Sequence, residues 1–284
     1  MLRGGVLHAT GAGATSRRGR GGAHFPSGPI RNPGPALSPI VIIPARLAAS
    51  RLPGKPLLRI GGEAMIVRVW RAAIAAGVGP VVVACAEEPI AAAIRAVGGD
   101  AVMTDPELPS GSDRILAALR LIDPSEKYKE VINLQGDMPF VDPAVLRACT
   151  DLLASRSDCD ISTVAAPEAS PADRGNPDVV KAVLTLQPGA ASGRALYFTR
   201  SALFGDGPIW RHIGLYGYRR AALERFAAAP PSPLERRERL EQLRALEMGM
   251  TIHAAIADAA PLSVDTPADL EAARAHAHHL VGKT

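Results

Sequence analysis

The sequence predicts a three-layer α/β protein, in which helices cover a mostly parallel sheet that carries a smaller mixed β extension. Between residues 39 and 155, short Val- and Ile-rich runs alternate with longer segments of helical periodicity. This alternation is typical of right-handed βαβ units and a parallel sheet. After residue 155, strand-like runs follow one another without helices between them, which indicates a mixed or antiparallel extension. At 284 residues and 47% hydrophobic, the chain can bury one full core.

In the first half of the chain, strands and helices are expected to alternate. The predicted strands cover residues 40–43, 81–85, 101–103 and 131–134. The predicted helices cover residues 64–76, 89–97, 112–122 and 142–154. Pro44 cuts off the first apolar run, and the last of these strands is expected near the centre of the sheet.

In the second half, the predicted strands cover residues 160–165, 179–186, 195–198 and 214–218. The segment Ser232-Pro233-Leu234-Glu235 has the N-cap, the proline and the glutamate of a capping box, so it begins a helix. The apolar face of this same helix is formed by Leu240, Leu243 and Leu246. Thr266-Pro267-Ala268-Asp269 repeats the pattern for a final helix that runs to about residue 279.

The charge of the chain is concentrated at its N-terminal end. Residues 1–38 hold five Arg and no Asp or Glu, while the whole chain has a net charge of +4. These five are Arg3, Arg17, Arg18, Arg20 and Arg31. The remaining chain carries 27 basic and 28 acidic residues. Binding of nucleic acid by the folded part therefore loses its main support.

Residues 1–38 are rich in Gly, Pro, Ser and Arg and show no hydrophobic periodicity, so we expect a disordered tail. A dispensable tail is the favoured interpretation. The Arg-rich, acid-free composition also overlaps with that of organellar transit peptides, and a start codon assigned too early would look the same.

The cysteines and the apolar segments indicate the compartment. Cys85, Cys149 and Cys159 form no C-x-x-C pair, which fits buried thiols in a reducing compartment and argues against a disulfide framework. The most apolar long stretch, residues 72–86, is interrupted by Gly and Pro and is shorter than the ~20 residues that cross a bilayer. A cytoplasmic protein that does not insert into membranes is expected.

A basic loop, residues 44–56, follows the first strand and contains Arg46, Arg51 and Lys55 but no acid. Sheets of this kind bind ligands at the carboxyl ends of their strands. A Walker phosphate loop is excluded, because Pro56 stands where that motif needs a Ser or Thr hydroxyl. Two interpretations remain open: a looser clamp for a nucleoside triphosphate, or an ordinary connection with solvated cations.

Two acids are candidates for a metal site. Asp137, in Leu134-Gln135-Gly136-Asp137-Met138-Pro139, follows a buried strand, and Asp265 directly precedes the final helix. Mg²⁺ prefers one or two carboxylates together with phosphate oxygens and water. The alternatives are a turn residue for Asp137 and a purely local stabilisation of a helix N-terminus for Asp265.

Two further segments are candidates for ligand contacts. The turn around Ser110 and Gly111 could offer free N–H groups to a base or an anion, or could simply cap a helix. The segment 211–218 alternates polar and aromatic residues at period two, which places His212 and Tyr216 on one face of a strand. A lone His in such a strand is more often structural.

In chain order, these segments resemble the 3-deoxy-manno-octulosonate (Kdo) cytidylyltransferases, or CMP-Kdo synthetases. The resemblance extends from Ile40 to Ala277. It rests on the motifs I-P-A-R-x-x-x-S-R-x-P-G-K-P, S-G-[ST]-D-R, Q-G-D-x-P, N-P-x-x-V-K, A-L-Y-F-[ST]-R, R-H-x-G-x-Y-G-Y, P-S-P-L-E, L-E-Q-L-R and V-D-T-P-x-D-L. So many collinear motifs make the resemblance highly specific.

The resemblance implies a nucleotide-diphospho-sugar-transferase-like fold, usually a homodimer. The implied enzyme joins CTP and Kdo into CMP-Kdo with release of pyrophosphate, a step of lipopolysaccharide biosynthesis. One domain would span residues 39–284. Its parts would be a nucleotide-binding half, a sugar-binding and dimerisation part, and a C-terminal helix that returns to the nucleotide half, at residues 39–155, 156–258 and 259–284.

The resemblance also implies roles for single residues. The nucleotide would contact Arg46, Arg51, Lys55, Ser110, Gly111 and Gln135. The sugar acid would contact Arg114, Gln135, Arg200, His212, Tyr216, Glu241 and Gln242. Asp137 and Asp265 would hold Mg²⁺ and, with Arg51 and Lys55, would form the catalytic set. In such a transfer the sugar hydroxyl attacks the α-phosphorus in line, so the protein mainly positions reactants and neutralises charge.

The chain departs from the family pattern at two places. Many members have Thr-Asp where this chain has Cys85-Ala86, and many have Glu at the position of Met138. Neither change removes an implied metal ligand. Two alternatives follow: transfer to another sugar acid, such as an amino-substituted Kdo, or a non-catalytic nucleotide-binding relative.

Overall fold

The computed structural model describes residues 39–48 and 51–281. All of these belong to one compact unit. The predicted tail, residues 1–38, lies outside the described residues. Among the described helices, none is long and apolar enough to cross a membrane.

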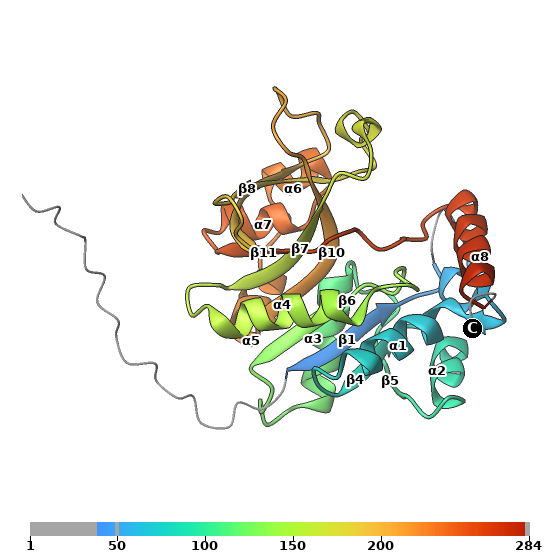
Figure 1. Ribbon diagram of the computed structural model, residues 1–284. Helices are drawn as coiled ribbons and strands as arrows, with labels where there is room; N and C mark the ends of the chain where they lie inside the picture. The colour runs from blue at the N-terminus through green and yellow to red at the C-terminus, as the bar shows by residue number, and fades with distance from the viewer. Residues whose placement is uncertain (1–38, 49–50, 282–284) are drawn as a thin grey trace, which may run out of the picture. The chain divides into compact units, whose positions relative to one another are not determined.

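Nine strands form one mixed sheet in the order β5-β4-β1-β6-β10-β7-β11-β9-β8 (Figure 1). Its strands are β1 (Ile40–Ala45), β4 (Val81–Cys85), β5 (Asp100–Met103), β6 (Glu130–Leu134), β7 (Ile161–Pro167), β8 (Lys181–Thr185), β9 (Ser192–Thr199), β10 (Trp210–Arg219) and β11 (Ile252–Ile256). The four strands of the first half run parallel, whereas β10 is antiparallel to both β6 and β7. The predicted parallel sheet with a mixed extension is confirmed.

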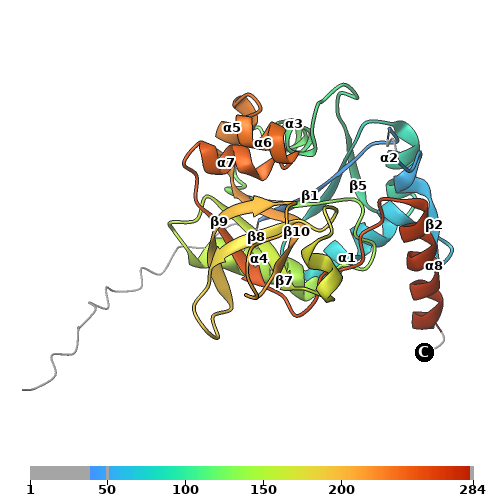
Figure 2. The ribbon, with the colours of Figure 1, turned by 90° about the horizontal axis from the view of Figure 1, so that it is seen from above.

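Helices cover both faces of this sheet and make the three predicted layers (Figure 2). The helices are α1 (Met65–Ala76), α2 (Glu88–Arg95), α3 (Gly111–Ile122), α4 (Pro143–Ser155), α5 (Arg220–Ala228), α6 (Pro233–Glu238), α7 (Gln242–Glu247) and α8 (Pro267–Val281). Residues of α1, α2 and α4 share one buried cluster, and residues of α3, α5 and α7 share another. Within β1, Val41 and Ile43 belong to the first cluster, and Ile40 and Ile42 belong to the second.

Strand β1 continues through Pro44 to Ala45, whereas the sequence predicted its end at Ile43. Residues 41, 43 and 45 pair toward β4, because Val41 N–H donates to the Pro80 carbonyl and Ala86 N–H donates to the Ala45 carbonyl. Pro44 therefore faces β6, whose pairing with β1 already ends at Ile42. Among the described strands, β6 does not pair with β1 at Pro44, so the missing N–H group of proline costs no ladder hydrogen bond there. Proline is therefore tolerated inside this strand.

The single helix predicted after Ser232 is wrong, because the structure breaks it into α6 and α7. The capping box itself is present: the Ser232 hydroxyl accepts from Glu235 N–H, and the Glu235 carboxylate accepts from Ser232 N–H. Arg239 then adopts a left-handed conformation with φ 56° and ψ 46°, which ends α6. This break turns the apolar face of α7 onto the sheet.

Some elements have no counterpart among the predicted ones. These are α5, β11, and a two-stranded hairpin formed by β2 (Arg59–Ile60) and β3 (Glu63–Ala64). Strand β11 is Ala-rich and lies between β7 and β9 with both faces buried. It therefore shows no alternation of apolar and polar residues, and its two β-branched residues, Ile252 and Ile256, stand only at its ends.

The chain after β11 leaves the sheet and ends in α8 beside the β2–β3 hairpin (Figure 1). A small apolar cluster holds α8 there through Leu270, Ala273 and Ala277, which pack with Leu52 and Ile60. This cluster brings the segment that precedes α8 next to the basic loop.

Candidate active site

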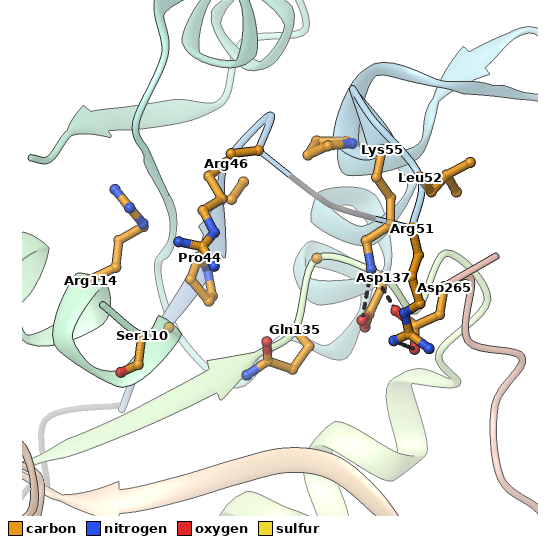
Figure 3. Close-up of a pocket in the computed structure, with 15 residues that line it drawn as sticks. Pro44, Arg46, Arg51, Leu52, Lys55, Ser110, Arg114, Gln135, Asp137 and Asp265 are labelled. Carbon is orange, nitrogen blue, oxygen red and sulfur yellow. Dashed lines mark hydrogen bonds and ion pairs between the residues drawn. The ribbon is translucent and has the colours of Figure 1, made fainter. Parts of the chain in front are cut away.

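A cavity of about 340 Å³ opens at the carboxyl ends of β1 and β6. It is lined by Pro44, Ala45, Arg46, Ala48, Arg51, Leu52, Lys55, Pro56, Ser110, Gly111, Arg114, Gln135, Gly136, Asp137 and Asp265. Every residue assigned to the nucleotide or to the metal from the sequence lies in this lining. Figure 3 shows the acids, Lys55 and Arg51 together on one side, with Arg46, Ser110 and Arg114 toward the other.

Lys55 joins the two predicted metal ligands. Its Nζ atom lies 3.2 Å from Asp137 Oδ2 and 3.0 Å from Asp265 Oδ1. Arg51 adds a longer ion pair, with its NH2 atom 3.5 Å from Asp265 Oδ2. Residues that are 210 positions apart in the sequence thus meet within one hydrogen-bond distance.

The electrostatics of this cluster are those of desolvated, mutually dependent charges. Burial works to lower the pKa of Lys55, but Asp137 and Asp265 outweigh it and the pKa is raised. Burial also raises the pKa of Asp137, with Asp265 adding to the rise and Lys55 opposing it. Burial therefore disfavours the charged forms of Lys55 and Asp137, and the opposite charge of each stabilises the charged form of the other.

The basic loop is closed at its neck by backbone hydrogen bonds. Gly54 N–H donates to the Leu47 carbonyl at 3.2 Å, and Gly54 has a φ of 68° that favours glycine. Leu47 N–H donates to Glu87 Oε2 at 3.0 Å. The role of Glu87 was not predicted, because Glu87 follows β4 in the run Glu87-Glu88, which is typical of an ordinary helix start.

Ser110 and Gly111 begin α3 at the edge of the cavity. The Ser110 hydroxyl accepts from Asp113 N–H at 3.1 Å, as an N-cap does. A Cβ atom on Gly111 would lie 3.5 Å from Pro44 Cγ and 3.8 Å from Gln135 Oε1, so this turn packs against the end of β1. The Gln135 amide donates to Asn133 Oδ1 at 3.2 Å, which orients it from the end of β6.

Arg114 lines the cavity, but its guanidinium donates hydrogen bonds to the loop after β5. Its guanidinium donates to Thr104 Oγ1 at 2.6 Å and to the carbonyls of Asp105 and Pro106 at 3.0 and 3.4 Å. The side chain is only 2% exposed. In this structure Arg114 holds the wall of the cavity.

The other residues assigned to the sugar acid lie outside the lining of this cavity. His212 and Tyr216 are neighbours on β10, with ring centroids 5.4 Å apart. Glu241 and Gln242 begin α7, and each has a buried polar atom, Glu241 Oε1 and Gln242 Nε2, with no hydrogen-bond partner among the described residues. Arg200 donates to the carbonyls of Glu238 and Pro177, at 3.1 and 3.0 Å.

One link joins Glu241 to the cavity wall. The hydroxyl of Ser112, in the first turn of α3, donates to Glu241 Oε2 at 3.0 Å. Burial raises the pKa of Glu241, and hydroxyl donors and Arg244 oppose the rise. Gly214 on β10 would place a Cβ atom 3.8 Å from Gln135 Cγ, so β10 also approaches the end of β6. The motif S-G-[ST]-D-R contains Ser112, but the sequence assigned roles only to Ser110, Gly111 and Arg114.

The two departures from the family pattern are buried. Met138 is 3% exposed and packs in the cluster shared by α1 and α4. Cys85 is fully buried, and burial raises the pKa of its thiol to about 11. Neither side chain is in the lining of the cavity. Among the described residues, no three or more His, Cys, Asp or Glu side chains gather into a metal site.

Comparison with known proteins identifies the family. A family profile described as cytidylyltransferase matches residues 40–252. The 3-deoxy-manno-octulosonate cytidylyltransferase of Parvibaculum lavamentivorans is 58% identical over 238 residues, which cover 84% of this chain and 92% of that protein. The protein of the same name from Methylobacterium radiotolerans is 59% identical over 239 residues, covering 84% and 96%.

The chain belongs to the 3-deoxy-manno-octulosonate cytidylyltransferase family. The predicted resemblance is thereby confirmed, and the chain is that of an enzyme. A solved CMP:2-keto-3-deoxy-manno-octonic acid synthetase, complexed with CTP, superimposes with a TM-score of 0.78 at 34% identity and covers 86% of this chain and 99% of its own. The 4-diphosphocytidyl-2C-methyl-D-erythritol synthase of Anaerococcus prevotii, at 11% identity and a TM-score of 0.57, covers 85% and 99% and shares the fold.

Proposed function

We propose that this member of the cytidylyltransferase family joins CTP to Kdo and gives CMP-Kdo and pyrophosphate, a step of lipopolysaccharide biosynthesis. The observation that carries the proposal is the cavity at the ends of β1 and β6, where Arg51 and Lys55 meet Asp137 and Asp265. Cations and carboxylates in one cavity suit a metal-bound triphosphate. The names of the relatives and the CTP complex of the similar structure support the same substrates.

The residues present fit a Mg²⁺ ion. The Lys55 ammonium already lies within 3.2 Å of an oxygen of each acid, so both carboxylates converge on a place that a cation occupies. Mg²⁺ needs only one or two carboxylates beside phosphate oxygens and water. We propose that Asp137 and Asp265 hold it. When bound, the ion would neutralise phosphate charge and favour the alkoxide form of the attacking sugar hydroxyl.

The chain's own side chains would do the positioning. Arg46, Arg51 and Lys55 would bind phosphate oxygens by charge-assisted hydrogen bonds. Ser110 and Gly111, at the start of α3, would border the cytosine. Gln135, oriented by Asn133, would lie between the nucleotide and the sugar. Holding both reactants in line, together with neutralising the phosphate charge, supplies most of the rate enhancement that such a transfer needs.

The sugar acid would lie beyond Gln135, against β10 and α7. Among the described residues, Glu241 Oε1 and Gln242 Nε2 are an acceptor and a donor without a hydrogen-bond partner, and sugar hydroxyls can satisfy both. His212, Tyr216 and Arg200 would complete this pocket. We further propose a cytoplasmic homodimer on the family resemblance, and light scattering after size-exclusion chromatography measures the oligomeric state.

The test is release of pyrophosphate in the presence of CTP, Kdo and Mg²⁺, with each component omitted in turn. The proposal predicts release only in the complete mixture. Amino-substituted Kdo and a sialic acid, assayed side by side with Kdo, decide between sugar acids. Absence of release with every sugar acid, at an enzyme concentration that binds CTP, would instead identify a non-catalytic nucleotide-binding relative.

A further inference from the structure

Strand β10 is irregular beside His212, and one hydroxyl lies at the irregularity. The pairing of β10 with β7 shifts register between Ile213 and Tyr216. Such a bulge leaves backbone groups without their ladder partners. Thr163, on β7 and fully buried, meets these groups with its side chain: Oγ1 lies 2.8 Å from the Leu215 carbonyl oxygen and 3.3 Å from that of Ile213.

The same Thr163 oxygen lies 2.9 Å from Nε2 of His212. A threonine hydroxyl has one proton, and both carbonyls at the bulge can only accept it. The imidazole nitrogen can donate or accept, so all three neighbours are satisfied together only when the hydroxyl proton points at the carbonyls, 2.8 Å away at Leu215. Toward His212 the hydroxyl oxygen can then only accept, so Nε2 must carry the ring proton and donate.

The His212 ring is neutral. Burial of the ring lowers the pKa of His212 to about 3. The aromatic rings of Phe198 and Tyr216 flank it, with centroids 4.8 and 5.4 Å away. A neutral ring that is protonated at Nε2 has a lone pair at Nδ1. Among the described residues, Nδ1 of His212 has no hydrogen-bond partner. Nδ1 is also absent from the fully buried polar atoms that lack a partner, so this atom is not fully buried.

We propose that Thr163 is a positioning residue that fixes His212 in the Nε2–H tautomer, so that Nδ1 accepts a hydrogen bond from a hydroxyl group of the sugar acid. The identity of the ligand rests on the proposed function, whereas the tautomer does not. A neutral acceptor at this place repels a carboxylate, since neither group has a proton to donate. His212 Nδ1 therefore accepts a hydrogen bond from a hydroxyl group, and the carboxylate of the sugar acid must bind elsewhere in the pocket.

The first test is spectroscopic and needs no turnover. Long-range ¹H–¹⁵N spectra of the full ¹⁵N-labelled chain distinguish protonated from unprotonated ring nitrogens, and His212→Asn assigns the signals. The wild type is expected to show protonated Nε2 and unprotonated Nδ1 at neutral pH. Kdo added without CTP should shift the Nδ1 signal of His212 and leave the Nε2 signal unchanged. Protonated Nδ1 in the wild type overturns the proposal, whether or not any variant folds.

The second test compares isosteric variants. Thr163→Val removes the acceptor and keeps the shape, so we expect mixed tautomers of His212 and a KM for Kdo raised about tenfold, as loss of one hydrogen bond implies. The KM for CTP should not change. Thr163→Ser keeps the hydroxyl and should restore both the tautomer and the KM.

The matched control is Thr150→Val on α4, which removes another buried hydroxyl that donates to a backbone carbonyl, that of Leu146 at 2.9 Å. It should alter neither the His212 signals nor either KM. If Thr163→Val matches this control in both readouts, the positioning role is refuted. Failure of the wild type to release pyrophosphate with Kdo refutes the proposed function and leaves the tautomer assignment standing.

Discussion

Arg51 shows how little a residue of the active site can contribute to folding. Its ion pair with Asp265 is 3.5 Å long, and its side chain is 61% exposed. Exposed pairs of this kind contribute about 0–1 kcal/mol to stability. A charged hydrogen bond to a phosphate is worth about 1.5–3 kcal/mol, because the ligand holds the cation in place.

We predict that Arg51→Ala weakens CTP binding about tenfold to a hundredfold and changes the free energy of unfolding by less than about 0.5 kcal/mol. Isothermal titration calorimetry and urea unfolding measure the two quantities. Arg95→Ala on α2 is the matched control, because Arg95 is also exposed and paired, with Glu88 at 2.7 Å, but lies outside the cavity. Equal CTP affinities for the two variants would remove Arg51 from the clamp.

Ser112 is predicted to act on the sugar through Glu241. Ser112→Ala removes the hydroxyl that donates to Glu241 Oε2. We expect the loss of this hydrogen bond to cost about 1–1.5 kcal/mol in sugar binding. The KM for Kdo should rise about tenfold while the KM for CTP stays near the wild-type value. Ser112→Thr, which keeps the hydroxyl, should recover most of the loss. A rise confined to CTP would show that Ser112 serves the nucleotide instead.

At the scale of elements, the turn after β6 fixes the distance between Asp137 and the basic loop. A Cβ atom on Gly136 would lie 3.2 Å from the Pro44 carbonyl oxygen and 3.3 Å from Ile66 Cδ1. Both contacts are tight, and the carbonyl belongs to the backbone of β1. Any larger residue at this position must push the end of β6 away from β1.

Gly136→Ala is therefore expected to lower kcat by up to about tenfold, since a displacement of about 1 Å at a reacting centre costs about a hundredfold and these contacts require a smaller shift. Gly175→Ala is the matched control, because its Cβ atom would meet nothing within 4 Å and its φ is −92°. Steady-state assays of pyrophosphate release measure both. A kcat for Gly136→Ala equal to that of the control would show that the turn can yield without moving Asp137.

The sequence predicts these elements well where local rules decide. The Val- and Ile-rich runs of β1, β4 and β6 and the capping box at Ser232 were located within a few residues. Prediction failed where the tertiary structure decides. Arg239 takes a left-handed conformation that nothing in its type favours. Strand β11 is stabilised by its neighbours and not by its own composition.

The candidate site was predictable to a similar degree. The ends of buried strands pointed to Lys55 and Asp137, because polar residues there are a local signal, whereas the metal role of Asp265 stayed open until the family resemblance implied it. Their contact depends on α8 packing beside the hairpin, which no local pattern reports. The hydrogen bond of Thr163 with His212 depends on strand register, and an apolar strand with one Thr gives no sign of it.

At the scale of the whole molecule, a buried ion pair joins the end of α3 to the start of α5. Asp123 lies 2.8 Å from Arg220 and accepts from the N–H groups of Lys127 and Tyr128. Burial works to raise the pKa of Asp123, but these hydrogen bonds and Arg220 outweigh it, so the pKa lies below its ordinary value of 3.8. A lowered pKa means that the folded state binds the proton more weakly than the unfolded state.

The stabilisation from Asp123 is thus complete above about pH 4 and is lost as the pH falls through the lowered pKa. We predict that the free energy of unfolding falls steeply below pH 4. Asp123→Asn should cost about 3–5 kcal/mol at pH 7 and should flatten this acid dependence. Urea unfolding as a function of pH measures both curves. An acid dependence of the variant as steep as that of the wild type would exclude Asp123 as its source.

We propose above all that Asp137 and Asp265, brought together by the return of α8, hold the metal ion that the transfer uses. The most direct measurement compares Asp137→Asn with the exposed control Asp151→Asn in pyrophosphate release and in CTP binding. We predict that Asp137→Asn lowers turnover at least about a thousandfold, because several kcal/mol of charge stabilisation are lost, while much of the CTP binding remains. The control should match the wild type. Turnover by Asp137→Asn at the wild-type rate would contradict the account.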